Sequence, residues 1–359
     1  MWSSVREAAR GLFGGGRDES RAPLAVAGAG AREQWHACDE AIMGTAIRVE
    51  LLCGDAREAG AAIDEVMREM HRIDRAMSPY KEDSELSRIN REAALRAVPV
   101  SAEMAELLER SIAFSRISEG AFDVTYASAG RLYDYRERIR PEPAALERAR
   151  AAIGFRNLLV DRRAGTVRFA QPGVCIDLGG IAKGHAVERG AALLRRRGIR
   201  HAIVTAGGDS RIVGDRGGRP WMIGVRDPRR AGELAAVLPL RDAAVSTSGD
   251  YERYFEEDGR RHHHILDPRT GVSPCALRGV TVVAPDGWTS EAMSKTVFVL
   301  GLERGMRLVD AQPGVDAIAI DARGVLHYSR GLRPATRSTD CSGTQPREPA
   351  ANAARKEAP

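Results

Sequence analysis

Hydrophobic residues follow two different spacings along the first part of the chain. Within residues 44–53 they occupy every second position at Ile47, Val49 and Leu51, which is typical of a half-buried strand. Over residues 57–77 they recur three and four positions apart, as on one face of a helix. The residues of this helical stripe are Ile63, Val66, Met67, Met70, Ile73 and Met77. We interpret its methionines as core packing and not as part of a cofactor site.

The same two spacings predict the remaining elements. A short helix capped by Asp83 or Ser84 is expected within residues 77–90. Longer helices are expected over residues 101–118, 141–153 and 290–301. Strands are expected at 157–160, 166–169, 174–176, 201–205, 221–225, 234–240, 243–246, 251–255, 261–266 and 279–284, with a hairpin over 317–328. Residues 246–251, STSGDY, are expected to form a hydroxyl-rich loop that lines a binding site or makes a turn. Because strands and helices do not alternate strictly, we predict an α+β fold of mixed, largely antiparallel sheets with interspersed helices.

Residues 174–197, VCIDLGGIAKGHAVERGAALLRRR, join a short apolar run to a glycine turn and an amphipathic helix that starts near Ile181. Gly179 and Gly180 would let the backbone approach a ligand, and the free N–H groups of the first helical turn favour a phosphate. Lys183 opposes the helix dipole unless a bound anion offsets its charge. Two interpretations stay open from these residues alone: a phosphate site, or a tight turn with a solvated lysine.

The composition favours a large globular core and argues against nucleic-acid binding. Of the 359 residues, 43% are hydrophobic and 29% charged, which suits one large domain or two closely packed lobes. The net charge is +5, but arginine and lysine are scattered among acids and only 5% of residues are aromatic, so no nucleic acid is expected. No disulfide framework or zinc site is expected, because the five cysteines are widely spaced and odd in number.

The two ends of the chain differ from the middle. Residues 1–38 are expected to be a flexible leader and residues 334–359 a disordered tail. Within residues 1–30, glycines and charges stand where a signal sequence needs a continuous apolar run, so the cytoplasm is the expected location. Export to the periplasm or the inner membrane surface is the alternative. No run approaches the roughly 18 apolar residues of a membrane span.

Several short motifs occur in an order that resembles one family. They are Met43-Gly44-Thr45, MSPYKEDSELSRIN from Met77, GAFDVT from Gly120, DLGGIAKG from Asp177, STSGDY from Ser246, HILDP from His264 and EAMSKTVFVLG from Glu291. Each motif alone is weak evidence, whereas their shared order over about 260 residues is specific. In this order the chain resembles the ApbE family, the FAD:protein FMN transferases, and residues 39–333 would form an ApbE-like domain.

The resemblance implies transfer of the FMN moiety of FAD to a threonine or serine hydroxyl of a target protein. The hydroxyl attacks the FMN phosphorus, AMP leaves, and a phosphoester-linked flavin remains. Such chemistry depends on positioning and on neutralising the charge of the pyrophosphate. Two alternatives stay open: hydrolysis of FAD to FMN and AMP, and a protein that binds FAD without chemistry.

The resemblance also implies which residues form the site. Those expected to bind FAD are Met43, Tyr80, Ala121, Phe122, Asp123, Asp177, Lys183, His264 and Ile265. Lys183 and His264 are the expected catalytic residues, because an imidazole suits deprotonation of the attacking hydroxyl. Mg²⁺ is the expected metal, held by the backbone carbonyl of Gly180 and by side chains at the positions of Glu291 and Lys295.

Considered without the family, some of these residues have structural alternatives. Asp177 would then cap the following helix, and Tyr80 is an aromatic residue in a loop after a proline. His262, His263 and His264 do not converge on one ion, because successive side chains of a strand point to opposite faces.

The sequence departs from the family pattern at the expected metal site. Relatives typically carry aspartate and threonine where this chain has Glu291 and Lys295. An ammonium at residue 295 places a positive charge where the metal would bind. The alternative is a plain helix ion pair, since a glutamate four residues before a lysine is the favoured order. We hypothesise that Lys295 partly replaces the metal, so that Mg²⁺ binds weakly or through Glu291 and water alone.

Overall fold

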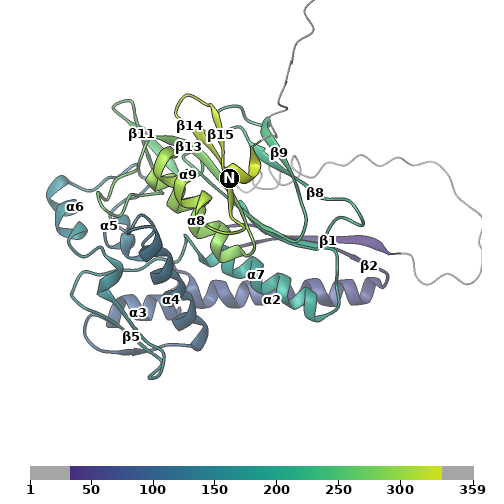
Figure 1. Cartoon of the computed structure of the whole chain (residues 1–359). Coiled ribbons are helices and arrows are strands. Elements are labelled where there is room, and N and C mark those ends of the chain that lie inside the picture. Colours follow the sequence, from purple (N-terminus) through teal and green to yellow (C-terminus); the bar gives the residue numbers. More distant parts are fainter. Residues whose placement is uncertain (1–32, 334–359) are drawn as a thin grey trace, which may run out of the picture.

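An antiparallel sheet runs through the middle of the molecule, and helices cover one of its faces (Figure 1). The computed structural model describes residues 33–333, and within that range the sheet has eight strands. In spatial order they are β1 (Gln34–Ile42), β2 (Thr45–Cys53), β6 (Ala202–Ala206), β7 (Asp209–Val213), β10 (Ala244–Gly249), β13 (Leu277–Ala284), β14 (Asp316–Asp321) and β15 (Leu326–Tyr328). All neighbouring pairs are antiparallel, which confirms the predicted α+β class.

Strand β1 corrects the expected boundary of the leader. Residues 34–38 belong to this strand, although they fall within the predicted leader 1–38. β1 lies at the edge of the sheet, and its mostly exposed side chains include Asp39 and Glu40, so it lacks the apolar alternation that would have predicted it. The rest of the leader up to residue 32 and the predicted tail 334–359 lie outside the described residues.

Met43 and Gly44 connect β1 to β2 in a two-residue turn. Both have positive φ angles, 56° and 69° respectively, as hairpin turns of this kind require. A methionine in that conformation is uncommon. A Cβ atom on Gly44 would lie 3.6 Å from the guanidinium of Arg253, so the tip of the hairpin lies against this arginine from the segment after β10.

The helical layer buries the main core. It consists of α2 (Ala56–Met77), α7 (Ala182–Arg196), α8 (Gly287–Leu300) and α9 (Leu302–Asp310). α2 packs on β1, β2 and α7; α7 packs on β6 and β7; and α8 packs on β10, β13 and α7. The predicted apolar stripe of α2 is confirmed, with Met67 and Met70 buried. The helix begins after Asp55, whose carboxylate accepts the backbone N–H groups of Arg57 and Glu58.

Smaller elements extend beside the helical layer (Figure 1). They are α3 (Glu85–Glu92), α4 (Ala102–Ile117), α5 (Ala127–Gly130), α6 (Pro143–Arg150), and a sheet in the order β3 (Val98–Pro99), β5 (Thr166–Phe169), β4 (Leu158–Asp161). The predicted helices and the β4–β5 hairpin are confirmed within one to three residues. Ser84 and not Asp83 caps α3, since its hydroxyl accepts the N–H of Ser87 at 3.0 Å.

A hairpin of β8 (Trp221–Arg226) and β9 (Leu234–Leu240) covers the other face of the sheet. The apolar cluster beneath it contains Ile203, Ile212, Trp221, Val225, Leu238, Leu240, Val245, Ile318 and Ile320. The rings of Trp35 and Trp221 meet edge to face 5.4 Å apart, and the guanidinium of Arg216 lies over both. A separate hairpin, β11 (Tyr254–Glu257) and β12 (Arg260–His263), follows β10.

Residues 174–176 are largely buried, as their apolar run predicts, but they do not form the predicted strand. Side chains take the place of a neighbouring strand. The amide of Asn90 bonds both backbone groups of Ile176 at 2.9 Å, and the hydroxyl of Ser128 accepts the N–H of Cys175 at 3.0 Å. The backbone is therefore satisfied without a ladder.

The predicted loop at residues 246–251 is wrong for its first four residues, which lie inside β10. The hydroxyl groups of Ser246 and Ser248 bond to α8, whereas that of Thr247 bonds to Thr281 on β13 at 2.9 Å. Ser246 and Ser290 share a hydrogen bond of 2.8 Å, as do Ser248 and Ser294. These pairs fix α8 against the middle of the sheet.

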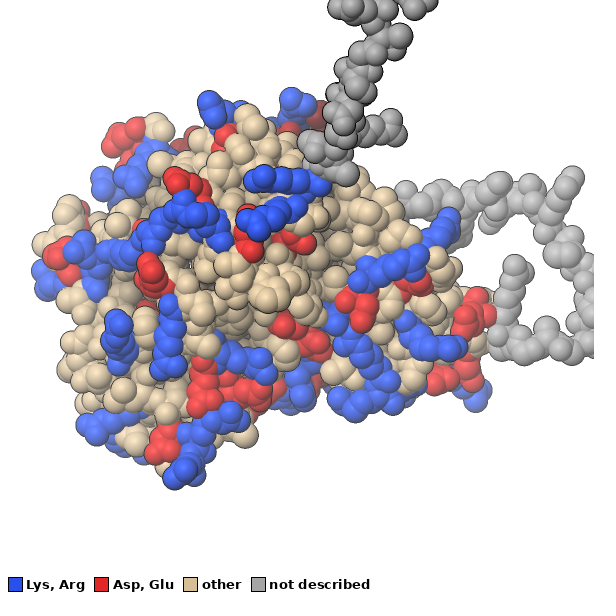
Figure 2. Space-filling model, viewed as in Figure 1, with Lys and Arg blue, Asp and Glu red and all other residues tan. Residues whose placement is uncertain are grey.

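Charges of both signs are interspersed over the face shown in Figure 2. None of the helices within residues 33–333 is long and apolar enough to cross a membrane.

The contact between α7 and α8 predicts opposite outcomes for two glycine substitutions. A Cβ atom on Gly184 would lie 2.1 Å from the carbonyl oxygen of Gly287, whereas one on Gly60, in the interior of α2, would meet nothing within 4 Å. Gly184→Ala should therefore lower the free energy of unfolding by about 1–3 kcal/mol or more through overpacking. Gly60→Ala should raise it by about 0.5–1 kcal/mol. Urea denaturation of both variants checks the prediction, and changes of the same sign would contradict it.

Candidate active site

Four charged side chains meet where the start of α7 crosses α8. The ammonium of Lys183 donates to the carboxylate of Asp209 on β7 and lies 3.2 Å from Oε1 of Glu291 on α8. The ammonium of Lys295 donates to the same Oε1 at 3.2 Å. Oε2 of Glu291 accepts the backbone N–H of Gly184 at 2.7 Å. We call these four residues, Lys183, Asp209, Glu291 and Lys295, the lysine–carboxylate cluster.

Burial makes the cluster interdependent. Asp209 and Glu291 are 0% exposed, and a buried carboxylate requires a cation or several donors nearby. Burial alone would lower the pKa of Lys183, but the charges of Asp209 and Glu291 outweigh it and raise that pKa above its ordinary value. Burial acts to raise the pKa of Asp209, but the charges of Lys183 and Lys295 lower it overall. Lys183 and Asp209 are therefore both ionised, and the cluster as a whole pairs two carboxylates with two ammonium groups.

This arrangement contradicts the solvated lysine, which was one of the two interpretations left open by the sequence. The side chain of Lys183 is 27% exposed and engages two carboxylates, so it is neither free in solvent nor an unpaired cation awaiting a phosphate. The sequence did not suggest Asp209 as its partner. The preceding Gly207-Gly208 pair was the available signal, because it marks a tight turn into the strand that carries Asp209.

Asp177 lies in the turn before α7 and does not cap that helix. Its Oδ1 accepts the N–H of Gly179 at 2.6 Å, whereas the N-cap position of α7 is Ile181 without a side-chain cap. Burial raises the pKa of Asp177, and bonds from Gly179 and Tyr126 together with the charge of Arg253 partly oppose this rise. The carboxylate therefore shapes the glycine turn and faces an aromatic residue and an arginine.

Residues 121–123 pack against the glycine turn before α7 and against neighbouring loops. Ala121 and Phe122 are buried, and the Phe122 ring would lie 3.2 Å from a Cβ atom on Gly180. Oδ1 of Asp123 accepts the N–H and hydroxyl of Thr125 at 2.9 and 2.6 Å. Oδ2 accepts the N–H of Phe155 at 2.6 Å. Both oxygens of Asp123 thus hold the chain's own loops together.

His264 follows β12 and lies close to the cluster. Its Nδ1 is 3.4 Å from the carbonyl oxygen of Arg253, so a proton on Nδ1 leaves Nε2 as the acceptor nitrogen. Burial, followed by the positive charges of Lys295 and Arg253, lowers the pKa of His264 to about 3. The imidazole is therefore neutral at physiological pH and able to accept a proton.

The other two histidines of the run have separate contacts. His262 stacks on Phe255 with ring centroids 5.1 Å apart, and Nε2 of His263 lies 2.8 Å from the carbonyl oxygen of Pro274. Neither contact includes His264.

The remaining predicted residues differ in exposure. Tyr80 is 84% exposed, and ionisation of its phenol would raise the pKa values of Tyr126 and Tyr135, which places it near both rings. Met43 lies in the hairpin turn next to Gly44, which faces Arg253, and Ile265 is buried. Arg253 was missed by the sequence analysis because a single arginine in a charged loop carries no pattern.

The residues present do not fit the Mg²⁺ that the family implies. Both oxygens of Glu291 already have donors, and Lys295 supplies an ammonium where an oxygen ligand is needed. Unit charges of like sign 4 Å apart repel by about 4 kcal/mol at an effective dielectric of 20, and a divalent ion doubles that figure. Within residues 33–333, no three His, Cys, Asp or Glu side chains are arranged to hold a metal.

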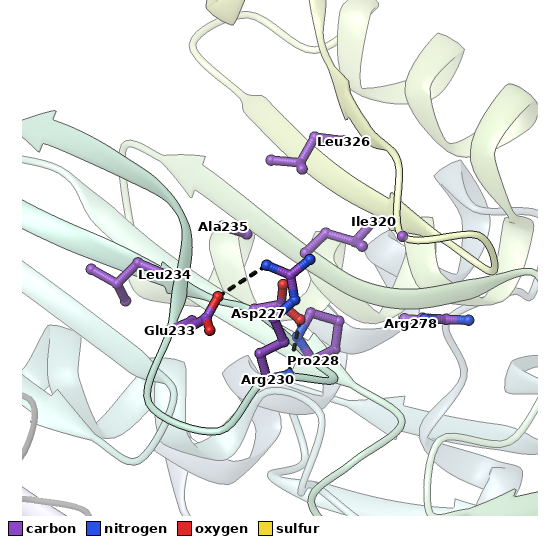
Figure 3. Close-up of a pocket in the computed structure, with 10 residues that line it drawn as sticks. Asp227, Pro228, Arg230, Glu233, Leu234, Ala235, Arg278, Ile320 and Leu326 are labelled. Carbon is purple, nitrogen blue, oxygen red and sulfur yellow. Dashed lines mark hydrogen bonds and ion pairs between the residues drawn. The ribbon is translucent and has the colours of Figure 1, made fainter.

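A pocket of about 290 Å³ lies elsewhere, between the turn of β8–β9 and the ends of β13–β15 (Figure 3). Its lining includes Asp227, Arg230, Glu233 and Arg278, with Arg230 paired to Glu233. None of the predicted site residues lines it.

The site combines a neutral histidine, two lysines paired with carboxylates, and a glycine turn at the start of a helix. Such a combination suits an enzyme whose substrate contains phosphate. The chain belongs to the ApbE family, whose model matches residues 43–319. This confirms the resemblance seen in the motifs.

Relatives and solved structures agree with this assignment. A protein of Treponema pallidum named FAD:protein FMN transferase is 34% identical over 334 residues, covering 87% of this chain and 92% of that protein. One of the same name from Haemophilus influenzae is 34% identical over 249 residues, covering 66% and 72%. The ApbE protein of Thermotoga maritima has a TM-score of 0.77 at 33% identity, covering 83% of this chain and 98% of that one. The flavin transferase ApbE of Vibrio cholerae has a TM-score of 0.75 at 27% identity, with the same coverage.

The lysine–carboxylate cluster predicts a large loss of stability on removal of Lys183. Lys183→Met should lower the free energy of unfolding by about 3–5 kcal/mol, because Asp209 then stays buried without its closest cation. Lys81→Met is the matched control. Its partner Asp74 is more accessible, so the loss should be about 1 kcal/mol or less.

Denaturant titration measures both losses. The double variant Lys183→Met, Asp209→Asn should recover part of the stability, since it removes the uncompensated charge. Equal losses in the two single variants would show that the buried pair is no more important than the surface one.

Proposed function

We propose that this chain transfers the FMN moiety of FAD to a serine or threonine hydroxyl of an acceptor protein and releases AMP. It is a transferase, as its family membership and the names of its relatives indicate. FAD is the donor, and the acceptor is a second protein. The observation that supports a hydroxyl as the attacking group is the neutral imidazole of His264, which lies near the positive charge of Lys295 and can accept the hydroxyl proton.

The proposed step balances as a displacement at phosphorus. The acceptor oxygen forms a bond to the FMN phosphorus while the bond from that phosphorus to the bridging oxygen of the pyrophosphate breaks. AMP leaves with the bonding electron pair, and Nε2 of His264 takes the hydroxyl proton. A base already neutral at physiological pH needs no prior deprotonation.

The residues of the site divide into two groups by what they offer FAD. Lys295 and the backbone at Gly180 would face the pyrophosphate, where positive charge stabilises the leaving group. Tyr80, Met43 and Asp177 would face the flavin, together with Tyr126 and Arg253. Lys183 then supports the phosphate side by keeping Asp209 and Glu291 neutralised.

Two further points belong to this proposal: the acceptor carries a threonine or serine flavinylation motif, and the reaction has a compartment. The cytoplasm is the proposed compartment, and secretion of a full-length reporter fusion would contradict it.

Incubation of the full chain with FAD, first alone and then with a candidate acceptor carrying a threonine or serine site, tests the function. Covalent flavin on the acceptor together with AMP, formed only when acceptor is present, is the expected result. AMP without acceptor would instead indicate a pyrophosphatase, and FAD binding without AMP would indicate a carrier. Mass spectrometry of the acceptor and chromatography of the nucleotides distinguish these outcomes.

His264→Ala should reduce flavin transfer by roughly 10²-fold or more while leaving FAD affinity nearly unchanged, because the base acts only on the attacking hydroxyl. In the wild type, the pKa of about 3 keeps His264 unprotonated between pH 8 and pH 5. The transfer rate should therefore show no loss from its titration in that range.

The matched control is His71→Ala on the exposed face of α2, which should transfer at the wild-type rate. Flavin transfer by His264→Ala at the rate of the unsubstituted chain would remove the proposed role. A pH profile of the unsubstituted chain with an apparent pKa near 6.5, absent from His264→Ala, would contradict the lowered pKa of His264.

A further inference from the structure

We propose that Lys295 takes the place of a divalent metal, so that this chain binds the pyrophosphate of FAD and transfers flavin without Mg²⁺. The inference rests on the proposed function and deepens it. It concerns the source of positive charge at the phosphates, which the relatives' pattern assigns to a metal site.

The position of Lys295 is the first support. Its ammonium lies 3.2 Å from Oε1 of Glu291, a position that the resemblance to the family implies for a metal ligand. Its Cγ lies 4.0 Å from the point where Gly180 would carry a Cβ atom, and the same resemblance implies the backbone of Gly180 as another ligand. Lys295 therefore lies among the groups that a metal would bridge.

The charge balance is the second support. Two fully buried carboxylates, Asp209 and Glu291, face two ammonium groups, Lys183 and Lys295. With both lysines present the sum is zero, so no negative charge is left for a metal to neutralise. With an uncharged residue at position 295 the sum becomes −1, which a cation would offset.

The remaining bonding capacity of Lys295 is the third support. An ammonium has three N–H donors, and Glu291 is the acceptor that the described residues provide. The side chain is 16% exposed, so the remaining donors are accessible to an anion entering the site. Lysine binds phosphate in this way, as a compact point charge. The positive charge that lowers the pKa of His264 includes that of Lys295, so the same ammonium lies near the proposed base.

The test compares flavin transfer by the full chain in excess EDTA and in millimolar Mg²⁺. The wild-type rate should differ less than fivefold between the two buffers, and titration calorimetry should detect no Mg²⁺ binding to the FAD-free protein. Lys295→Thr, which supplies a hydroxyl in place of the ammonium, should lose tenfold or more of its rate in EDTA and recover with Mg²⁺. Lys295→Met, which supplies neither charge nor ligand, should stay slow in both buffers.

Arg307→Ala is the control, because Glu303 and Arg307 form a pair of the same spacing on the surface of α9. It should behave as the wild type. A wild-type rate that falls more than fivefold in EDTA and returns with Mg²⁺ would overturn the inference, as would Lys295→Thr that remains fully active in EDTA.

Failure of the proposed function gives a different result. If no acceptor is flavinylated in either buffer, FAD affinity measured by flavin fluorescence still tests the inference. Equal wild-type affinity in EDTA and Mg²⁺, with a loss of tenfold or more in Lys295→Met, supports the lysine as the phosphate-binding charge. Wild-type affinity that requires Mg²⁺ contradicts it.

Discussion

Two carboxylates without solvent contact, Asp209 and Glu291, set the main constraint on this structure. Each needs a cation within bonding distance, and the cations come from helices that are distant in sequence. The approach of α7 and α8 is possible because Gly184 and Gly287 lack side chains where the helices cross. Serine pairs between β10 and α8 then hold the second helix in place. The position of the site is therefore determined by backbone contact and hydroxyl pairing as much as by the charges themselves.

Most of the elements could be predicted from the sequence, and the failures have physical causes. The stripe of α2 and the β4–β5 hairpin follow from spacing alone, since one face of each is buried. Strand β7 was not predicted, because its polar residues Asp209 and Ser210 interrupt the apolar pattern. Residues 174–176 were predicted as a strand because they form a short apolar run. Such a run does not reveal whether the backbone hydrogen bonds of a buried segment go to a neighbouring strand or, as here, to a side chain such as Asn90.

Some features of the candidate site could likewise be predicted from the sequence, and others could not. Position 183 could be singled out from its place in a helix start, but its partner Asp209 is brought in by the tertiary fold from 26 residues away. Asp123 matches a family motif, yet both of its oxygens bond to neighbouring loops. A motif predicts where a carboxylate lies in the fold, but its hydrogen-bond partners depend on the surrounding loops. The ion pair of Lys295 with Glu291, in contrast, could be predicted from the sequence, because the two residues lie four apart on a helix.

The two edge strands of the central sheet are poor partners for another extended chain. An extended peptide that added itself to the sheet would have to pair with β1 or β15. β1 presents Asp39 and Glu40 along an exposed edge, which disfavours such pairing, and β15 offers only three residues. Addition of another strand to the central sheet is therefore disfavoured at both of its edges. The sheet that supports the site is thus protected from pairing with a second chain.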